Sequence, residues 1–160
     1  MTAERTFGFF MPSVNLMGIG AIKEAGPRIN SLGCKKALLV TDNGLFKMGV
    51  ADDVAEYICE AGVEVVIFPG SEPNPTDTNV EAGLKAYTDN GCDSIVSLGG
   101  GSSHDCAKGI GLVATNGGTI HNYEGLDQSL KALPPLVAIN TTAGTASEMT
   151  RFCIITDTSR

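Results

Sequence analysis

Short apolar runs alternate along this chain with segments whose apolar residues recur at helical spacing. The runs are apolar almost throughout, which is typical of strands whose sheet is covered by helices on both faces. Strands are therefore predicted at residues 36–41, 63–68, 94–98, 136–140 and 152–156, with a short β-prone stretch at 6–10.

The segments between these runs show the 3.6-residue period of amphipathic helices. Helices are predicted at residues 52–61, 78–90 and 102–115. Gly62 and Gly91 follow the first two, and glycine commonly ends a helix. Apolar residues between positions 19 and 32 also have helical spacing, but Pro27 should break or kink that segment.

Strands that alternate with helices imply right-handed parallel crossovers. We therefore predict an open, doubly wound, mostly parallel Rossmann-like α/β sheet. The 160 residues suffice for one domain, spanning 1–160. In such sheets ligands bind beyond the carboxyl ends of the strands, so the residues that follow each strand are the candidates for function.

Composition and charge argue against several classes of partner. The chain has 18 acidic and 11 basic residues, a net charge of −7, and no long basic run, which argues against nucleic acid. No apolar stretch approaches the roughly 20 residues needed to span a bilayer. The five cysteines include no CxxC pair, so we expect buried free thiols in a reducing cytoplasm, without disulfides or a cysteine zinc site.

The strongest chemical signal is three consecutive glycines, Gly99, Gly100 and Gly101, between a predicted strand and a predicted helix. Glycines let a ligand approach the backbone, and a helix N-terminus offers free N–H groups to a pyrophosphate. Ser102 and Asp105 also form an S-x-x-D capping pattern, so a well-capped turn without a ligand is the alternative. The segment is neither the G-x-G-x-x-G fingerprint nor a P-loop.

Polar residues follow the other strands as well. Asp42 could accept hydrogen bonds from adenosine ribose hydroxyls and would repel a 2′-phosphate, which favours NAD, or it could be an ordinary turn aspartate. Asn74 lies in the Pro-Asn-Pro-Thr turn after the strand at 63–68. The segment at 140–148 supplies several hydroxyls, although residues 145–148 also fit a helix start.

His104 and His121 are the only histidines, and they have no HExxH or other ligand spacing. We expect solvated or capping roles for them. No catalytic residue and no complete metal site is predicted within the chain.

Two long segments carry a specific resemblance to a known protein family. GGGSSHDCAKGIGLVATNGG (99–118) and NTTAGTASEMTRFCIITD (140–157) resemble signature segments of the iron-dependent (group III) alcohol dehydrogenases. FFMPSVNLMGIGAIKEAG (9–26) and EPNPT (72–76) fit the same family. The most similar branch contains bacterial NAD-linked ethanol, methanol and 1,3-propanediol dehydrogenases. The resemblance covers essentially the whole chain and implies an N-terminal dinucleotide-binding α/β domain, like that of dehydroquinate synthase, followed by a helical domain.

The resemblance also implies roles for single residues. Asp42 would hold the adenosine ribose, Asn74 would approach the cofactor, and Asp105 would lie near the pyrophosphate. The pyrophosphate would be wrapped by Gly100, Gly101 and Ser102. The adenine and ribose side would be lined by Thr141, Thr142 and Thr145. Ser102-Ser103 replaces the family's Ser-Pro pair, a mild departure.

The family's metal, iron or zinc, is held by one aspartate and three histidines of the helical domain, at positions beyond Arg160. We therefore expect the metal only with that domain, and a lysine expected shortly after ITDT is also not included. The parent enzyme would transfer a hydride between NAD and a primary alcohol or aldehyde, as a cytoplasmic homo-oligomer. Two alternatives stay open: a glycerol- or lactaldehyde-type dehydrogenase of the same fold, and a non-catalytic module that binds dinucleotide or partner subunits.

Overall fold

The structure, a computed structural model, describes residues 14–160, so the predicted strand at 6–10 lies outside the described residues. In chain order the elements are the 3-10 helix η1 (Ala21–Glu24), α1 (Ala25–Ser31), β1 (Lys36–Asp42), α2 (Asn43–Lys47), α3 (Val50–Glu60), β2 (Glu64–Ser71), α4 (Asp77–Asp89), β3 (Ser94–Gly99), α5 (Gly101–Asn116), the 3-10 helix η2 (Ile120–Tyr123) and β4 (Leu136–Asn140).

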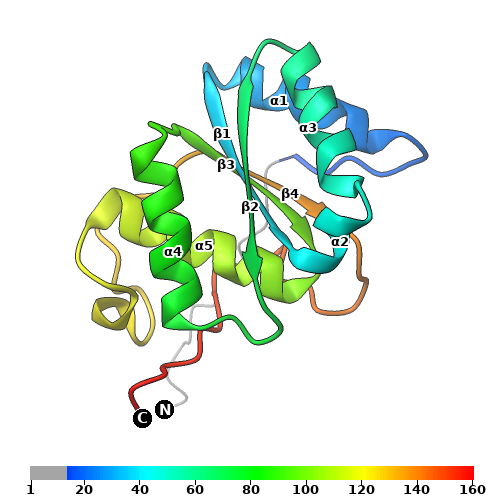
Figure 1. Ribbon diagram of the computed structural model, residues 1–160. Coiled ribbons are helices and arrows are strands. Elements are labelled where there is room, and N and C mark those ends of the chain that lie inside the picture. The colour runs from blue at the N-terminus through cyan, green and yellow to red at the C-terminus, as the bar shows by residue number, and fades with distance from the viewer. Residues whose placement is uncertain (1–13) are drawn as a thin grey trace, which may run out of the picture.

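The four strands form one parallel sheet in the order β2-β1-β3-β4. Helices α1, α2 and α3 lie on one side of the sheet, and α4 and α5 lie on the other (Figure 1). The predicted doubly wound α/β fold is thereby confirmed. The chain leaves β1 in one direction and later continues from β3 in the other, so the strand order reverses between these two strands.

Each face of the sheet packs into its own core. Within β1, Ala37 and Leu39 belong to the core under α1 and α3, whereas Leu38 and Val40 belong to the core under α4 and α5. All four side chains have no exposed surface. Two-sided burial is the physical reason why the strand is apolar throughout instead of alternating.

The helix predictions are confirmed to within a few residues. Helix α4 begins after Thr76, whose side chain forms a capping box with Asn79. Gly62 and Gly91 follow the ends of α3 and α4 with φ values of +83° and +64°, the left-handed region that glycine tolerates. Pro27 lies in the first turn of α1, where a missing N–H costs little, so the helix begins just before the proline instead of breaking at it.

One prediction of regular structure is wrong, and one open alternative is not realised. Residues 152–156 form no strand, and only Thr156 makes an isolated parallel bridge, to Thr76. The apolar pattern of this segment predicts a strand that other elements cover. The side chains of Phe152 and Ile154 are instead exposed. The helix start that residues 145–148 also fit is absent, because residues 145 and 146 are irregular and residues 147–149 form a turn.

The cysteine prediction is correct for bonding but not for burial. All five are free thiols, yet Cys59 is exposed and Cys153 is half-buried. No helix within residues 14–160 has the length and apolar character that a bilayer crossing requires.

Candidate functional site

A cavity of about 680 Å³ opens beyond the carboxyl ends of the strands. It lies where the strand order reverses between β1 and β3, the place where open α/β sheets commonly bind ligands. Six of the residues predicted from the sequence line it: Asp42, Gly100, Gly101, Ser102, Thr142 and Thr145.

The glycine loop packs closely against the threonine segment after β4. A Cβ atom placed on Gly100 would lie 3.2 Å from Oγ1 of Thr142, and one on Gly101 would lie 3.1 Å from Cβ of Thr145. Side chains at these two positions would therefore press into the cavity wall. The glycines keep open a backbone surface at the N-terminus of α5, where unpaired N–H groups and the positive end of the helix dipole attract an anion.

Asp42 ends β1 and caps α2. Its Oδ1 accepts hydrogen bonds from the backbone N–H groups of Gly44 (2.8 Å) and Leu45 (3.0 Å). Its Oδ2 faces the neighbouring strand end, 3.6 Å from where a Cβ of Gly99 would stand. One carboxylate oxygen is thus used structurally, and the other faces the cavity region beside the glycine loop.

Three other predicted residues, Gly99, Thr141 and Asn74, lie next to lining residues but are not part of the lining. Gly99 has a φ of +145°, and Thr141 donates its backbone N–H to the Gly99 carbonyl at 2.9 Å. Asn74 has a φ of +54° and donates its backbone N–H to Ser102 Oγ at 3.4 Å. These residues shape the loops that meet at the cavity without lining it.

The predicted Ser102–Asp105 capping pair does not form. The N-cap of α5 is Gly100, and no side chain caps that helix. Asp105 turns instead toward Lys108, with Oδ1 3.1 Å from Nζ, and accepts a hydrogen bond from Ser147 Oγ. Because α5 begins at Gly101, two residues into the glycine run, Ser102 is already inside its first turn.

Sequence reasoning missed part of the lining: Asn43, Gly44, Ser71, Glu72, Pro73 and Ser103. Strand β2 runs three residues beyond its predicted end at Phe68, which carries Ser71 to the same sheet edge as Asp42. The signal for this was weak because Pro69 and Gly70 interrupt the apolar run. The described lining contains Asp42 and Glu72 but no lysine or arginine, so backbone N–H groups are its anion-attracting feature.

His104 is buried, contrary to the expectation of a solvated or capping role. Its Nδ1 lies 2.7 Å from Ser97 Oγ of β3, and its Nε2 lies 3.3 Å from Oδ1 of Asn140 at the end of β4. Since Oδ1 only accepts, Nε2 carries the proton and Ser97 donates to Nδ1. Burial lowers the pKa of His104, which fits this neutral form.

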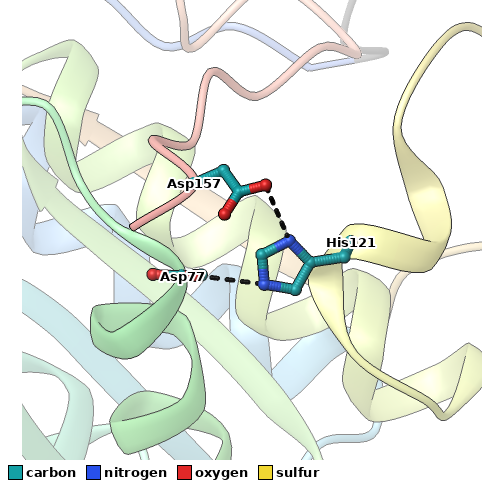
Figure 2. Close-up of side chains that lie close together, drawn as sticks. All are labelled: Asp77, His121 and Asp157. Atoms are coloured by element: carbon teal, nitrogen blue, oxygen red, sulfur yellow. Dashed lines mark ion pairs between the residues drawn. The ribbon is translucent and has the colours of Figure 1, made fainter. Parts of the chain in front are cut away.

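A second polar cluster lines a smaller cavity of about 240 Å³, which lies between residues of α4, α5, η2 and the C-terminal segment. His121 Nε2 lies 3.0 Å from Asp77 Oδ2, and His121 Nδ1 lies 3.4 Å from Asp157 Oδ2 (Figure 2). The three residues come from distant parts of the sequence, and no spacing predicted their meeting.

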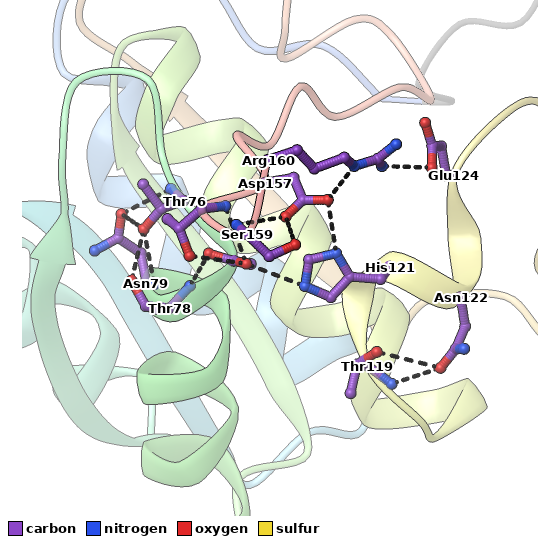
Figure 3. A network of polar contacts seen from close by, with 12 residues as sticks. Thr76, Thr78, Asn79, Thr119, His121, Asn122, Glu124, Asp157, Ser159 and Arg160 are labelled. Atoms are coloured by element: carbon purple, nitrogen blue, oxygen red, sulfur yellow. Dashed lines mark hydrogen bonds and ion pairs between the residues drawn. The ribbon is translucent and has the colours of Figure 1, made fainter.

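This cluster is the single group of three metal-ligand side chains within residues 14–160, but its geometry is that of an ion-pair network. The two carboxylates face opposite nitrogens of one ring, so no ring nitrogen points at both. Arg160 Nε already pairs with Asp157 at 2.6 Å, and Arg160 also pairs with Glu124 (Figure 3). Hydrogen bonds from Ser159 and then from Arg160 lower the pKa of Asp157. The network fastens the C-terminal segment to α4 and η2.

Fold and site together define this chain as an open, doubly wound α/β domain of the Rossmann-like class, with a cavity lined by glycines and small polar residues at the switch point of its sheet. The chain matches the iron-containing alcohol dehydrogenase family over residues 12–160. It therefore belongs to that family of oxidoreductases.

Individual relatives agree with this membership. The chain is 53% identical to the 1,3-propanediol dehydrogenase of Klebsiella pneumoniae over 96% of its own length, and 51% identical to the NAD-dependent methanol dehydrogenase of Bacillus methanolicus over 95%. A crystal structure of a 1,3-propanediol oxidoreductase superimposes with a TM-score of 0.93 at 54% identity, covering 97% of this chain and 41% of that one. The chain spans about 40% of the length of these relatives.

Proposed function

We propose that this chain is the NAD-binding part, residues 1–160, of a metal-dependent alcohol dehydrogenase. The observation that carries the proposal is the glycine loop at the N-terminus of α5, which opens into the 680 Å³ cavity between the ends of β1 and β3. A helix N-terminus with no side chain in front of it suits a pyrophosphate.

The roles that the family resemblance implies for the cavity residues are compatible with this geometry. Gly100, Gly101 and Ser102 would hold the pyrophosphate, and the free oxygen of Asp42 would accept from the adenosine ribose. Thr142 and Thr145 would form the facing wall, while Gly99, Thr141 and Asn74 would shape the loops that meet there. Asp105 would act indirectly, through the Lys108 and Ser147 contacts described above.

The whole enzyme would transfer a hydride between the nicotinamide and a small primary alcohol or aldehyde, as a cytoplasmic homo-oligomer. The names of the relatives, which act on 1,3-propanediol and methanol, support this substrate class. Iron or zinc would supply Lewis-acid polarisation of the substrate oxygen. The family resemblance implies that the ligands of that ion, one aspartate and three histidines, would lie in the part of the relatives' length that this chain does not span.

Cofactor binding is tested by titrating the purified protein with NADH and following the nucleotide's fluorescence. Gly100→Val places a branched side chain against Thr142, where the pyrophosphate would approach the backbone. Losing two or more hydrogen bonds to a charged group, at about 1.5–3 kcal/mol each, weakens binding roughly 100-fold or more. Ala132→Val, in an exposed loop, is the matched control and should bind as the wild type does.

Circular dichroism of each variant separates a binding defect from misfolding, because the φ of Gly100 is −92°, which valine tolerates. Wild-type affinity in a folded Gly100→Val protein would assign the loop a purely structural role. Binding that is absent from the wild type itself would favour the second candidate, a module that contacts partner subunits without a dinucleotide.

A further inference from the structure

Lys108 is a buried lysine on the side of α5 that faces the loop after β4. Only 9% of its surface is exposed, although it carries a charge. Buried ammonium groups need close oxygen partners because the loss of water costs several kcal/mol. The groups around the Lys108 ammonium therefore indicate the structural role of its charge.

Six oxygen atoms gather around the Lys108 ammonium group. Ser147 provides its carbonyl at 2.9 Å and its hydroxyl at 3.0 Å, and Thr150 provides its carbonyl and hydroxyl, both at 3.4 Å. The Phe152 carbonyl also accepts from Nζ, and Asp105 Oδ1 lies 3.1 Å away. Five of these six oxygens belong to the segment 147–152.

This arrangement resembles the oxygen shell of a hard cation more than a simple ion pair. Asp105 supplies the one negative charge, and Ser147 links the two groups because its hydroxyl donates to Asp105 and accepts from Lys108. The carbonyls of three different residues turn inward toward one point. Such convergence fixes the path of the backbone.

The segment needs this support because it lacks regular structure. Residues 141–152 form turns and irregular backbone without helix or strand. Ala146 has a φ of +54°, a left-handed conformation that costs a non-glycine residue about 1–2 kcal/mol. Ala146 directly precedes Ser147, so the strain lies next to the anchoring contacts. Thr145, on the other side of Ala146, packs on Gly101 in the cavity wall.

We propose that Lys108 is a positioning residue that acts as a built-in cation: its ammonium orders segment 147–152 and thereby holds Thr145 against the glycine loop. One helix then fixes both walls of the cavity, since α5 begins with the glycine loop and carries Lys108 two turns later. The loop-ordering claim stands on its own, and the consequence for cofactor affinity rests on the proposed NAD site.

The test separates the charge pair from the oxygen shell. Lys108→Met keeps the length of the side chain but removes the charge. Lys108→Met combined with Asp105→Asn also removes the carboxylate that would be left unpaired. Lys85→Met, in an exposed i,i+4 pair with Asp89 on α4, is the matched control. Amide hydrogen exchange of peptides covering 145–152 is measured for each, together with NADH affinity.

We expect exchange in 145–152 to accelerate about tenfold or more in both the single and the double variant, with the rest of α5 protected. NADH affinity should fall by about tenfold or more in parallel, because the wall is no longer held in place before binding. Lys85→Met should change neither quantity. Recovery of slow exchange in the double variant would overturn the proposal, because Lys108 would then serve only to neutralise Asp105.

A chemical rescue gives an independent measurement. Lys108→Ala removes the atoms of n-propylammonium, so adding this ion should restore slow exchange in 145–152, whereas sodium chloride at the same ionic strength should not. Failure of rescue in a folded Lys108→Ala protein would contradict the built-in cation. If the wild type does not bind NADH, the proposed NAD site is refuted. The exchange measurement still decides whether Lys108 orders the segment 147–152.

Discussion

The three glycines of the loop at 99–101 serve different purposes. Gly99 has a φ of +145°, and a Cβ there would lie 2.8 Å from Cβ of Ser103, so a side chain would strain the backbone and collide with the next turn. Gly100 has ordinary backbone angles, so its missing side chain matters for space beside Thr142 and not for conformation. Substitution at Gly99 should cost stability, and substitution at Gly100 should cost binding.

Asp42 should set the preference for NAD over NADP. We expect the wild type to bind NADH about 5- to 150-fold more tightly than NADPH, because a carboxylate beside a 2′-phosphate costs on the order of 1–3 kcal/mol. Asp42→Asn should narrow this difference, as measured by parallel titrations with both nucleotides. Asparagine caps helices as well as aspartate does, so α2 should keep its N-cap.

The control for this experiment is Asp42→Gly, which removes both the charge and the hydrogen bonds to Gly44 and Leu45. Asp42→Gly should also narrow the difference between NADH and NADPH affinity. Because the cap hydrogen bonds are lost, it should in addition lower the melting temperature. Equal affinity of the wild type for the two nucleotides would mean that Asp42 is only the cap of α2.

At the scale of elements, α5 organises the site. Its N-terminus carries the glycine loop, Lys108 lies two turns later, and His104 joins α5 to β3 through Ser97 and to the end of β4 through Asn140. One side chain of α5, that of His104, therefore contacts both strands. The shape of the cavity therefore depends on how α5 packs against the sheet and not on any single loop.

His104 should make stability depend on pH. Burial lowers the pKa of His104 in the folded protein, whereas the unfolded chain takes up a proton near pH 6.5. Below about pH 6.5 the unfolded state then binds more protons than the folded state. The contribution of neutral His104 to stability is therefore complete above that pH and is lost as the pH falls. Each unit of pKa difference is worth at most about 1.4 kcal/mol.

The measurement is urea unfolding of the wild type and His104→Gln between pH 5 and 8. The wild type should lose more stability than the variant between pH 7 and 5, and His121, present in both, cancels in the comparison. If the stabilities of the wild type and of His104→Gln change in parallel with pH, His104 has the same pKa in the folded and unfolded states and the prediction is wrong.

At the scale of the whole molecule, the 160-residue chain should have no dehydrogenase activity. It spans about 40% of the length of its relatives, and the described residues offer only the ion-pair network of Asp77, His121 and Asp157 to a metal. Catalytic metals usually need three or four protein ligands around one point. Purified chain, NAD, several primary alcohols and each divalent metal should yield no NADH above a control without alcohol.

Metal analysis of the same preparations provides the companion measurement. A stoichiometric ion together with alcohol-dependent NADH formation would contradict the prediction and would place the ligands within these 160 residues. An NADH complex without turnover would agree with a chain that binds the cofactor and leaves the chemistry to the remainder of the enzyme.

The sequence by itself determined the fold class and the sheet edge that carries the site. Strands buried on both faces must be apolar throughout, and turns at helix ends select glycine, so these features are written locally in the chain. The strand at 152–156 was predicted wrongly because an apolar run indicates burial only if another element covers it, and Ile154 has no such cover.

Only the tertiary structure decided which polar groups meet. Asp105 fits a capping pattern by its spacing from Ser102, yet Lys108 and Ser147 attract it more strongly, since a buried ammonium must find a carboxylate and a carbonyl shell. Asp77, His121 and Asp157 come together because Thr156 pairs with Thr76 beside the start of α4. Contacts between residues far apart in the chain depend on how the elements pack, and no local pattern records them.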